Sequence, residues 1–259
     1  MVYVDDILLT GTNEELVSTI IEQMKERFET VDLGDAKFIV GMAIHRNRDA
    51  GTILLTQEAY TKAVLAKFGM ADLHPTKTPA EVGPMSTVVE EETLTPDETT
   101  MFRSATGSAL YICRKSRPDL SHTILVLTKS MAKPGTKAWA KLKRLMRYLK
   151  GTASLGITYS EDASNGGKLT TYVDSDFAGD IDDRKSTTGV IIELAGGVVD
   201  STATKQTVTA VSSAEAEYVA MSKACKIILY WRHLLKTINR EQKESTILYE
   251  DSTGAMSTR

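Results

Sequence analysis

Residues 172–179 are Tyr-Val-Asp-Ser-Asp-Phe-Ala-Gly, and this stretch decides how the last third of the chain folds. Alternating strand formers predict a β-strand over 169–176. The same pattern predicts strands over 187–194, 198–205 and 247–251. Between the last two of these, a helical pattern runs from Ser213 to about Leu235. This order of strands and helix predicts a mixed sheet packed by helices.

The helix that begins near Ser213 directs one carboxylate toward this sheet. Its apolar stripe recurs at steps of three and four, through Met221, Ala224, Ile228, Trp231 and Leu235. Four residues before Met221 the stripe reaches Glu217, whereas Glu215 lies about 200° away and is expected to form a capping box with Ser212. A buried carboxylate is costly without a metal or a partner. Glu217 is therefore a candidate metal ligand; the alternative is an ordinary first-turn Glu favoured by the helix dipole.

Two further carboxylate positions belong with Glu217. Strand alternation puts Asp174 and Asp176 on one face, so geometry alone does not choose between them. Asp251 ends the last strand, where it could reach the edge of the sheet or simply cap the next helix. Glu250 is expected to face the other side of that strand.

The N-terminus carries a second acidic feature. Strand formers flank Asp5 and Asp6, which predicts a strand-turn-strand. Two adjacent carboxylates repel, and a divalent cation would relieve the repulsion. The alternative is a plain hairpin turn, where Asp is common. A helix capped by Asn13, strands around 36–44 and 52–55, and a helix capped by Thr56 and stopped by Gly69 are expected next.

The middle of the chain changes composition twice. Residues 81–100 are acidic and contain no lysine or arginine, which indicates an exposed connection. A capping box over 95–98, with proline at the first helical position, starts a helical region that runs to about Lys150. Within it, residues 136–150 carry six positive side chains and no negative ones. We expect phosphate contacts from Lys141, Arg144 and Arg147, or else a solvated basic face.

Composition narrows the classes of protein. The 259 residues are 42% hydrophobic and 25% charged, with a net charge of −3, which fits a globular protein with one or two domains. The two cysteines form no zinc or disulfide pattern, and no apolar run is long enough for a membrane span. Arg184 and Lys185, in a polar turn, are further candidates for backbone contacts with a nucleic acid, against a plain loop.

Several motifs occur in the order found in a known family. Tyr3-Val4-Asp5-Asp6 resembles the YVDD motif of reverse transcriptases, and residues 33–41 resemble the stretch after it in copia-type retrotransposons. Shorter matches follow at 57–60, 67–70 and 117–119, and residues 172–179 and 212–218 resemble the family's RNase H motifs. The resemblance covers the whole chain in order.

The resemblance implies an α/β (α+β) fold in four segments. These are the C-terminal part of the reverse transcriptase palm and the start of the thumb (1–80), an acidic linker (81–100), a helical thumb or connection (101–160) and an RNase H-like domain (161–259). It favours Asp174 over Asp176 and implies catalytic and metal-binding roles for Asp174, Glu217, Asp251, Asp5 and Asp6. The cofactor would be Mg²⁺ or Mn²⁺ in two-metal sites.

The partners implied are a primer-template or an RNA–DNA hybrid and the remainder of the Pol polyprotein, with no membrane. The location implied is intracellular, in a cytoplasmic virus-like particle or the nucleus. The family's upstream polymerase Asp and its fourth RNase H carboxylate fall outside these residues. We therefore expect no polymerisation by the chain alone and weak or absent hybrid cleavage. The alternative is a decayed, inactive fragment that at most binds nucleic acid.

Overall fold

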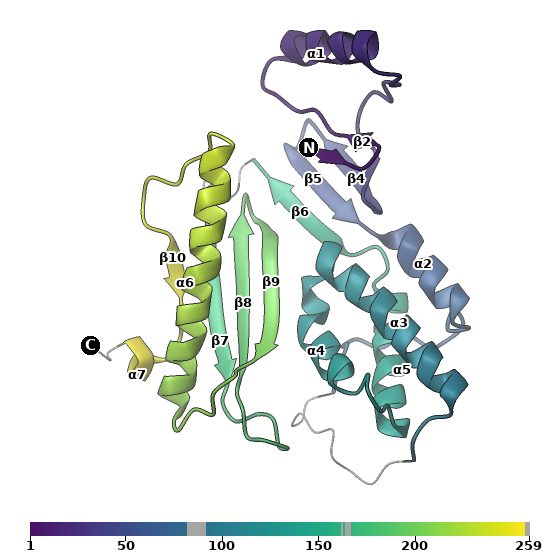
Figure 1. Cartoon of the computed structure of the whole chain (residues 1–259), viewed down its shortest axis with the longest axis vertical. Helices are drawn as coiled ribbons and strands as arrows, with labels where there is room; N and C mark the ends of the chain where they lie inside the picture. The colour runs from purple at the N-terminus through teal and green to yellow at the C-terminus, as the bar shows by residue number, and fades with distance from the viewer. Residues whose placement is uncertain (82–91, 162, 164–166, 257–259) are drawn as a thin grey trace.

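The computed structural model of the chain describes residues 1–81, 92–161, 163 and 167–256. Its fold is mixed α/β, as expected from the sequence. Figure 1 shows a small hairpin and a helix at the top, a group of helices on the right, and a sheet covered by a long helix on the left. Every helix in the described part of the chain is too short or too polar to cross a lipid bilayer.

The N-terminal segment is a hairpin followed by an exposed helix. Strands β1 (Val2–Tyr3) and β2 (Asp6–Ile7) pair antiparallel, which confirms the expected strand-turn-strand. Helix α1 (Glu14–Arg27) begins where predicted, because the Asn13 side chain accepts a hydrogen bond from the Leu16 amide at 3.0 Å. The helix has no buried residue.

The first four-stranded sheet is antiparallel throughout, in the order β3-β4-β5-β6. The single strand expected around 36–44 is instead a hairpin of β3 (Phe38–Ile39) and β4 (Met42–Asn47). Val40 and Gly41 turn the chain there with φ of 46° and 76°, a left-handed pair typical of tight hairpins. Strand β5 (Thr52–Thr56) then pairs with β6 (Gly156–Ser160), which follows about a hundred residues later.

Four helices form the hydrophobic core beside this sheet: α2 (Glu58–Lys67), α3 (Pro96–Lys115), α4 (Ser121–Lys129) and α5 (Thr136–Gly151). The capping box of α3 is confirmed, since Thr95 and Glu98 exchange side-chain and backbone hydrogen bonds. Helix α2 begins one residue later than expected, because Thr56 ends β5 and Gln57 takes the N-cap position without a side-chain bond. Most of the expected acidic linker, residues 82–91, lies outside the described residues.

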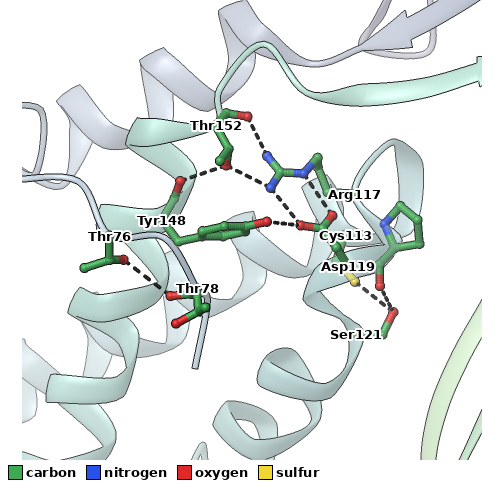
Figure 2. A network of polar contacts seen from close by, with 9 residues as sticks. Thr76, Thr78, Cys113, Arg117, Asp119, Ser121, Tyr148 and Thr152 are labelled. Carbon is green, nitrogen blue, oxygen red and sulfur yellow. Dashed lines mark hydrogen bonds and ion pairs between the residues drawn. The ribbon is translucent and has the colours of Figure 1, made fainter. Parts of the chain in front are cut away.

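A buried arginine joins the helices of this core (Figure 2). Arg117 is 2% exposed and precedes the short 3₁₀ helix η1 (Pro118–Leu120). Its guanidinium donates to both carboxylate oxygens of Asp119, at 2.9 and 2.8 Å, and to Thr152 at the end of α5. Tyr148 donates to the same Asp119 carboxylate and lies under the guanidinium. The charge of Arg117 is thus fully paired, and the 117–119 motif stabilises the helical core.

The second sheet has the order β10-β7-β8-β9 and carries the acidic candidates. Strands β7 (Thr170–Asp176), β8 (Thr187–Leu194) and β9 (Gly197–Lys205) form an antiparallel meander, and β10 (Ile247–Tyr249) pairs parallel to β7. Helix α6 (Ser213–Thr237) packs on one face, and the short α7 (Thr253–Met256) follows β10. All four predicted strands agree with the structure to within two residues at each end.

The second sheet contacts both the first sheet and the helices. The Ser160 amide of β6 donates to the Ala195 carbonyl at 2.9 Å, and the Tyr159 hydroxyl donates to the Val198 carbonyl at 2.8 Å. A Cβ at Gly197 would approach the Thr158 carbonyl to 2.7 Å, so only glycine allows β9 to come this close to β6. Strand β9 also faces η1 and α4 (Figure 1).

Candidate carboxylate site

Glu217 lies where the helix phase predicts it. The buried positions of α6 are Ala216, Glu217, Ala220, Ala224, Ile228 and Leu235. Glu217 is 6% exposed, whereas Glu215 is exposed. The Ser212 hydroxyl accepts from the Glu215 amide at 3.1 Å, but the Glu215 carboxylate accepts from Val211 rather than from Ser212. The expected capping box is therefore only half formed: the Glu215 carboxylate binds the amide one residue before the N-cap instead of the N-cap amide.

The surroundings of Glu217 disfavour its charge. Burial raises the pKa of the Glu217 carboxyl to about 7, against the opposing effect of the nearby Ser175 hydroxyl and with a further contribution from the negative charges of Glu250, Asp174 and Asp251. Its Oε2 atom is buried without a hydrogen-bond partner, and so is the adjacent Ser175 hydroxyl. A buried acceptor with no donor is costly. Glu217 is thus a carboxylate for which the protein supplies no positive partner.

Strand β7 contributes Asp174 from its exposed face. Thr171, Val173 and Ser175 are buried under α6, and Asp174 and Asp176 are exposed on the opposite face, in agreement with the predicted alternation. Asp176 packs against Gly179, where a Cβ would meet its carboxylate at 1.8 Å. The charge of Asp174 is among those that raise the pKa of Glu217. Asp174 and Asp176 remain on the same exposed face of β7, as the strand pattern predicts.

The end of β10 contributes two acidic residues, one of which sequence reasoning missed. Asp251 is exposed and does not cap α7, because the Ser252 hydroxyl accepts from the Ala255 amide instead. Glu250 was expected on the other side of the strand. Its Oε1 atom accepts from the Asp251 and Ser252 amides at 3.1 and 3.0 Å, and its Oε2 atom is buried with no hydrogen-bond partner among the described residues. Among the charges that raise the pKa of Glu217, that of Glu250 has the largest effect. In the sequence, the only sign of this role is that Glu250 precedes Asp251.

These residues come from three elements that meet at one end of the sheet. Strands β7 and β10 run parallel, β10 ends level with Tyr172 of β7, and α6 begins beside the lower end of β7 in Figure 1. Carboxylate oxygens are the ligands that Mg²⁺ prefers, and two buried orphan oxygens suit a cation chemically. Among the described residues, however, no three acidic, His or Cys side chains converge closely enough to form a ready metal cage.

Asp5 and Asp6 lie elsewhere in the molecule. They belong to the exposed N-terminal hairpin at the upper end of Figure 1, far from the start of α6. Val4, just before them, has φ of 51°, which is strained for a β-branched residue. Such strain clusters at functional sites. The charges of Asp174, Glu250 and Asp251 all act on Glu217, but Asp174 leaves β7 on the face opposite α6, and these carboxylates form no ready metal-binding group in the described part of the chain. Asp5 and Asp6 are a separate pair in the hairpin.

The predicted basic contacts fall on two surfaces. On α5, Lys141 is exposed, whereas Arg144 pairs with Glu81 at 2.8 Å and Arg147 donates to the His74 carbonyl at 2.6 Å. These arginines hold the 74–81 segment against the helix. Arg184 is exposed and Lys185 half-buried, in the loop between β7 and β8.

Comparisons with known proteins identify relatives along the whole chain. A family model described as reverse transcriptase (RNA-dependent DNA polymerase) matches residues 1–82. The Retrovirus-related Pol polyprotein from transposon TNT 1-94 of Nicotiana tabacum is 33% identical, covering 99% of this chain and 19% of that protein. The corresponding polyprotein from transposon RE2 of Arabidopsis thaliana is 33% identical over 98% of this chain and 17% of its own length.

A third relative is similar in length to this chain. It is an uncharacterized mitochondrial protein of Arabidopsis thaliana, 32% identical over 86% of this chain and 89% of that protein. No solved structure matches. The chain spans about a fifth of the two polyproteins it matches. It therefore belongs to the family of retrovirus-related Pol polyproteins of copia-type transposons, with the reverse transcriptase match in its first 82 residues.

Proposed function

We propose that the chain is part of a reverse transcriptase and RNase H unit within such a polyprotein. In this proposal residues 161–259 form an RNase H-like domain that serves cleavage of the RNA strand of an RNA–DNA hybrid in the intact polyprotein, with weak or absent cleavage by the chain alone. The observation that carries the proposal is Glu217, a buried carboxylate with an orphan oxygen among three other acidic residues. A structural role for a buried carboxylate usually provides a positive partner, and the ion pairs of the described residues include none for Glu217.

The acidic residues of this site have different proposed roles. Asp174, Glu217 and Asp251 would hold two Mg²⁺ or Mn²⁺ ions, and Glu250, through its bonds to the 251 and 252 amides, orients the turn that carries Asp251. The bound ions supply an activated water and stabilise the leaving 3′ oxygen. Because the pKa of Glu217 is about 7, its carboxyl releases a proton when a cation binds near neutral pH. Cation binding and ionisation are thereby coupled.

The N-terminal hairpin is proposed to serve the polymerase reaction. Members of the reverse transcriptase family use divalent metals, and Asp5 and Asp6 are adjacent exposed carboxylates of the matched region that would meet one together with residues from the rest of the polyprotein. Residues 1–80 would then be the palm with the start of the thumb, and 101–160 the thumb or connection helices. Val4 supports this role, since its left-handed backbone is strained for a β-branched residue and such strain clusters at functional sites.

The nucleic acid would be held by basic side chains on both parts. Lys141 on α5, and Arg184 and Lys185 beside the carboxylate end of the second sheet, are proposed to contact phosphates. Arg144 and Arg147 would have to exchange their present protein partners for phosphates. A primer-template or RNA–DNA hybrid, the remainder of the polyprotein, and an intracellular site in a virus-like particle or the nucleus complete the proposal.

Cation binding by the purified chain tests the carboxylate site. Thermal unfolding followed with increasing Mn²⁺ at pH 8 should show stabilisation of the wild type and a much smaller effect in Glu217→Gln. Glu215→Gln, on the exposed side of the same helical turn, is the matched control and should respond like the wild type. Equal stabilisation of all three proteins would remove Glu217 from the site.

Activity separates the proposal from its rival, a non-catalytic chain that only binds nucleic acid. A labelled RNA–DNA hybrid is incubated with the chain and Mg²⁺ or Mn²⁺, and the RNA products are resolved on a gel. RNA cleavage that Asp174→Asn abolishes and Asp176→Asn leaves supports the proposed enzyme and assigns the strand ligand. Salt-sensitive hybrid binding without cleavage, together with no response to Mn²⁺, supports the rival.

A further inference from the structure

The loop between β7 and β8 is a closed structure rather than a loose turn. The Arg184 amide donates to the Asp180 carbonyl at 2.8 Å, and the Asp180 amide donates to the Lys185 carbonyl at 3.2 Å. Ala178 and Arg184 both have left-handed backbones, with φ of 51° and 57°. Non-glycine residues adopt this conformation only where the surroundings enforce it. Something in the fold must therefore hold Arg184 in place at the exposed tip.

The Asp180 carboxylate is the residue that holds this loop. It is 2% exposed, and its Oδ2 atom accepts from Lys129 of α4 and from Lys205 of β9. Its Oδ1 atom accepts from the Asp182 amide at 3.0 Å within the loop. Lys205 also pairs with Asp183 at 2.7 Å. Asp180 thus connects the loop to a helix of the core and to the far edge of the sheet.

The loop lies at the same end of the sheet as the carboxylates. It leaves β7 directly after Asp176, two residues beyond Asp174, and Figure 1 shows it at the lower end, where α6 and α7 also meet. Of its basic residues, Arg184 is exposed. An exposed arginine on the loop that follows these acidic residues could bind a phosphate of a polyanion that the carboxylates would otherwise repel.

We propose that Asp180 is a positioning residue that, through Lys129 and Lys205, holds Arg184 against the phosphate backbone of the RNA–DNA hybrid. This inference rests on the proposed function. Asp180 touches neither the nucleic acid nor the cations and acts through the conformation of the loop. We call the ion pairs of Asp180 with Lys129 and Lys205 the clamp. Because Lys129 belongs to α4, this helix contributes to the contact that Arg184 of the β7–β8 loop would make with the hybrid.

The sign of the charge effect distinguishes positioning from simple electrostatics. Asp180→Asn removes a negative charge and releases two lysines, so Coulomb's law alone predicts tighter binding of a polyanion. Loss of the clamp predicts weaker binding, because Arg184 no longer keeps its strained backbone. Asp182→Asn is the matched control, since it removes the same charge from the same loop without touching the two lysine pairs.

The experiment measures hybrid affinity of the full chain by fluorescence anisotropy over a range of salt concentrations, without divalent cations. Asp180→Asn is expected to weaken binding about fivefold and to lower the salt slope by about one, the loss of one phosphate contact. Arg184→Ala should give the same change, and the double variant should be no weaker than Arg184→Ala alone. Asp182→Asn should bind as the wild type does or slightly more tightly.

Lys129→Met provides a second variant if Asp180→Asn folds poorly. Hydrogen exchange at the 180–185 amides should accelerate in this variant, while the amides of α6 should keep their wild-type rates. Affinity of Asp180→Asn equal to or above that of the wild type, or losses that multiply in the double variant, would overturn the inference and leave the proposed function standing. A wild type that neither binds the hybrid nor responds to Mn²⁺ would overturn the proposed function as well.

Discussion

Asp180 and Glu217 are two buried carboxylates of the same sheet-and-helix unit with opposite environments. Their residues are 2% and 6% exposed. Burial alone raises the pKa of each, but the ammonium groups of Lys129 and Lys205 hold the pKa of Asp180 at about 2. The charges that act on Glu217 are those of the acidic residues Glu250, Asp174 and Asp251, the Ser175 hydroxyl offsets them only in part, and the pKa of Glu217 is about 7. The difference teaches that the partner, not the burial, separates a structural carboxylate from a candidate ligand.

The largest expected effect on stability comes from removing the positive partners of Asp180, which gives it an environment like that of Glu217. The double variant Lys129→Met/Lys205→Met leaves the Asp180 carboxylate buried without its cations, and we expect it to lower the free energy of unfolding by about 3 kcal/mol. Urea denaturation at pH 7 measures this. Adding Asp180→Asn should recover part of the loss, because the uncompensated charge disappears. Lys133→Met/Lys137→Met, which removes two exposed lysines, is the control and should unfold close to the wild type.

The reverse change acts on Glu217. Glu217→Gln removes a charge that the fold disfavours, so the free energy of unfolding should rise by about 2 kcal/mol at pH 8 without divalent cations. Between pH 4.5, the ordinary value, and pH 7, the folded wild type holds a proton that the unfolded chain has released. Wild-type stability should therefore fall through this window as pH rises, and the gain from the variant should appear over the same window. A gain that is equally large at pH 4 would exclude charge as its cause.

A smaller effect is expected from Asp180 in acid. Its folded pKa of about 2 lies below the ordinary 3.8, so its ion pairs contribute stability that is present above about pH 4 and lost as pH falls toward 2. We expect Asp180→Asn to be less stable than the wild type by about 1 to 2 kcal/mol at pH 6. The difference should shrink toward zero near pH 2, as followed by circular dichroism. A difference that persists at pH 2 would point to lost packing instead.

Local rules in the sequence were sufficient to predict Glu217. A helix has one period, so the stripe from Met221 to Leu235 fixes which side of the first turn is buried, and the structure agrees. Strand alternation likewise placed Asp174 and Asp176 together, and the capping box placed the start of α3. Each of these features depends on residues within a few positions of one another.

The environment of Asp180 depends on contacts that no local rule contains. Lys129 and Lys205 lie 51 and 25 residues away along the chain, and they meet Asp180 only because β9 faces α4. Strand β6 also depends on a distant contact, because its partner β5 lies about a hundred residues earlier in the chain. The Glu250 carboxylate accepts hydrogen bonds from two amides of the turn after β10, a contact that strand alternation does not contain. A folded structure is needed to find partners of this kind.

The smallest effect is expected from the N-terminal acidic pair, whose carboxylates are exposed, in contrast to the buried carboxylates of Asp180 and Glu217. Asp5 and Asp6 are exposed, and water already solvates their charges. We expect Asp5→Asn/Asp6→Asn to leave the urea midpoint unchanged and to keep the full stabilisation by Mn²⁺, because the hairpin offers no buried orphan oxygen for a cation to satisfy. Thermal unfolding with and without Mn²⁺ measures both. If this variant lost the Mn²⁺ effect while Glu217→Gln kept it, the divalent site of the chain would lie in the hairpin, and the argument from burial would fail.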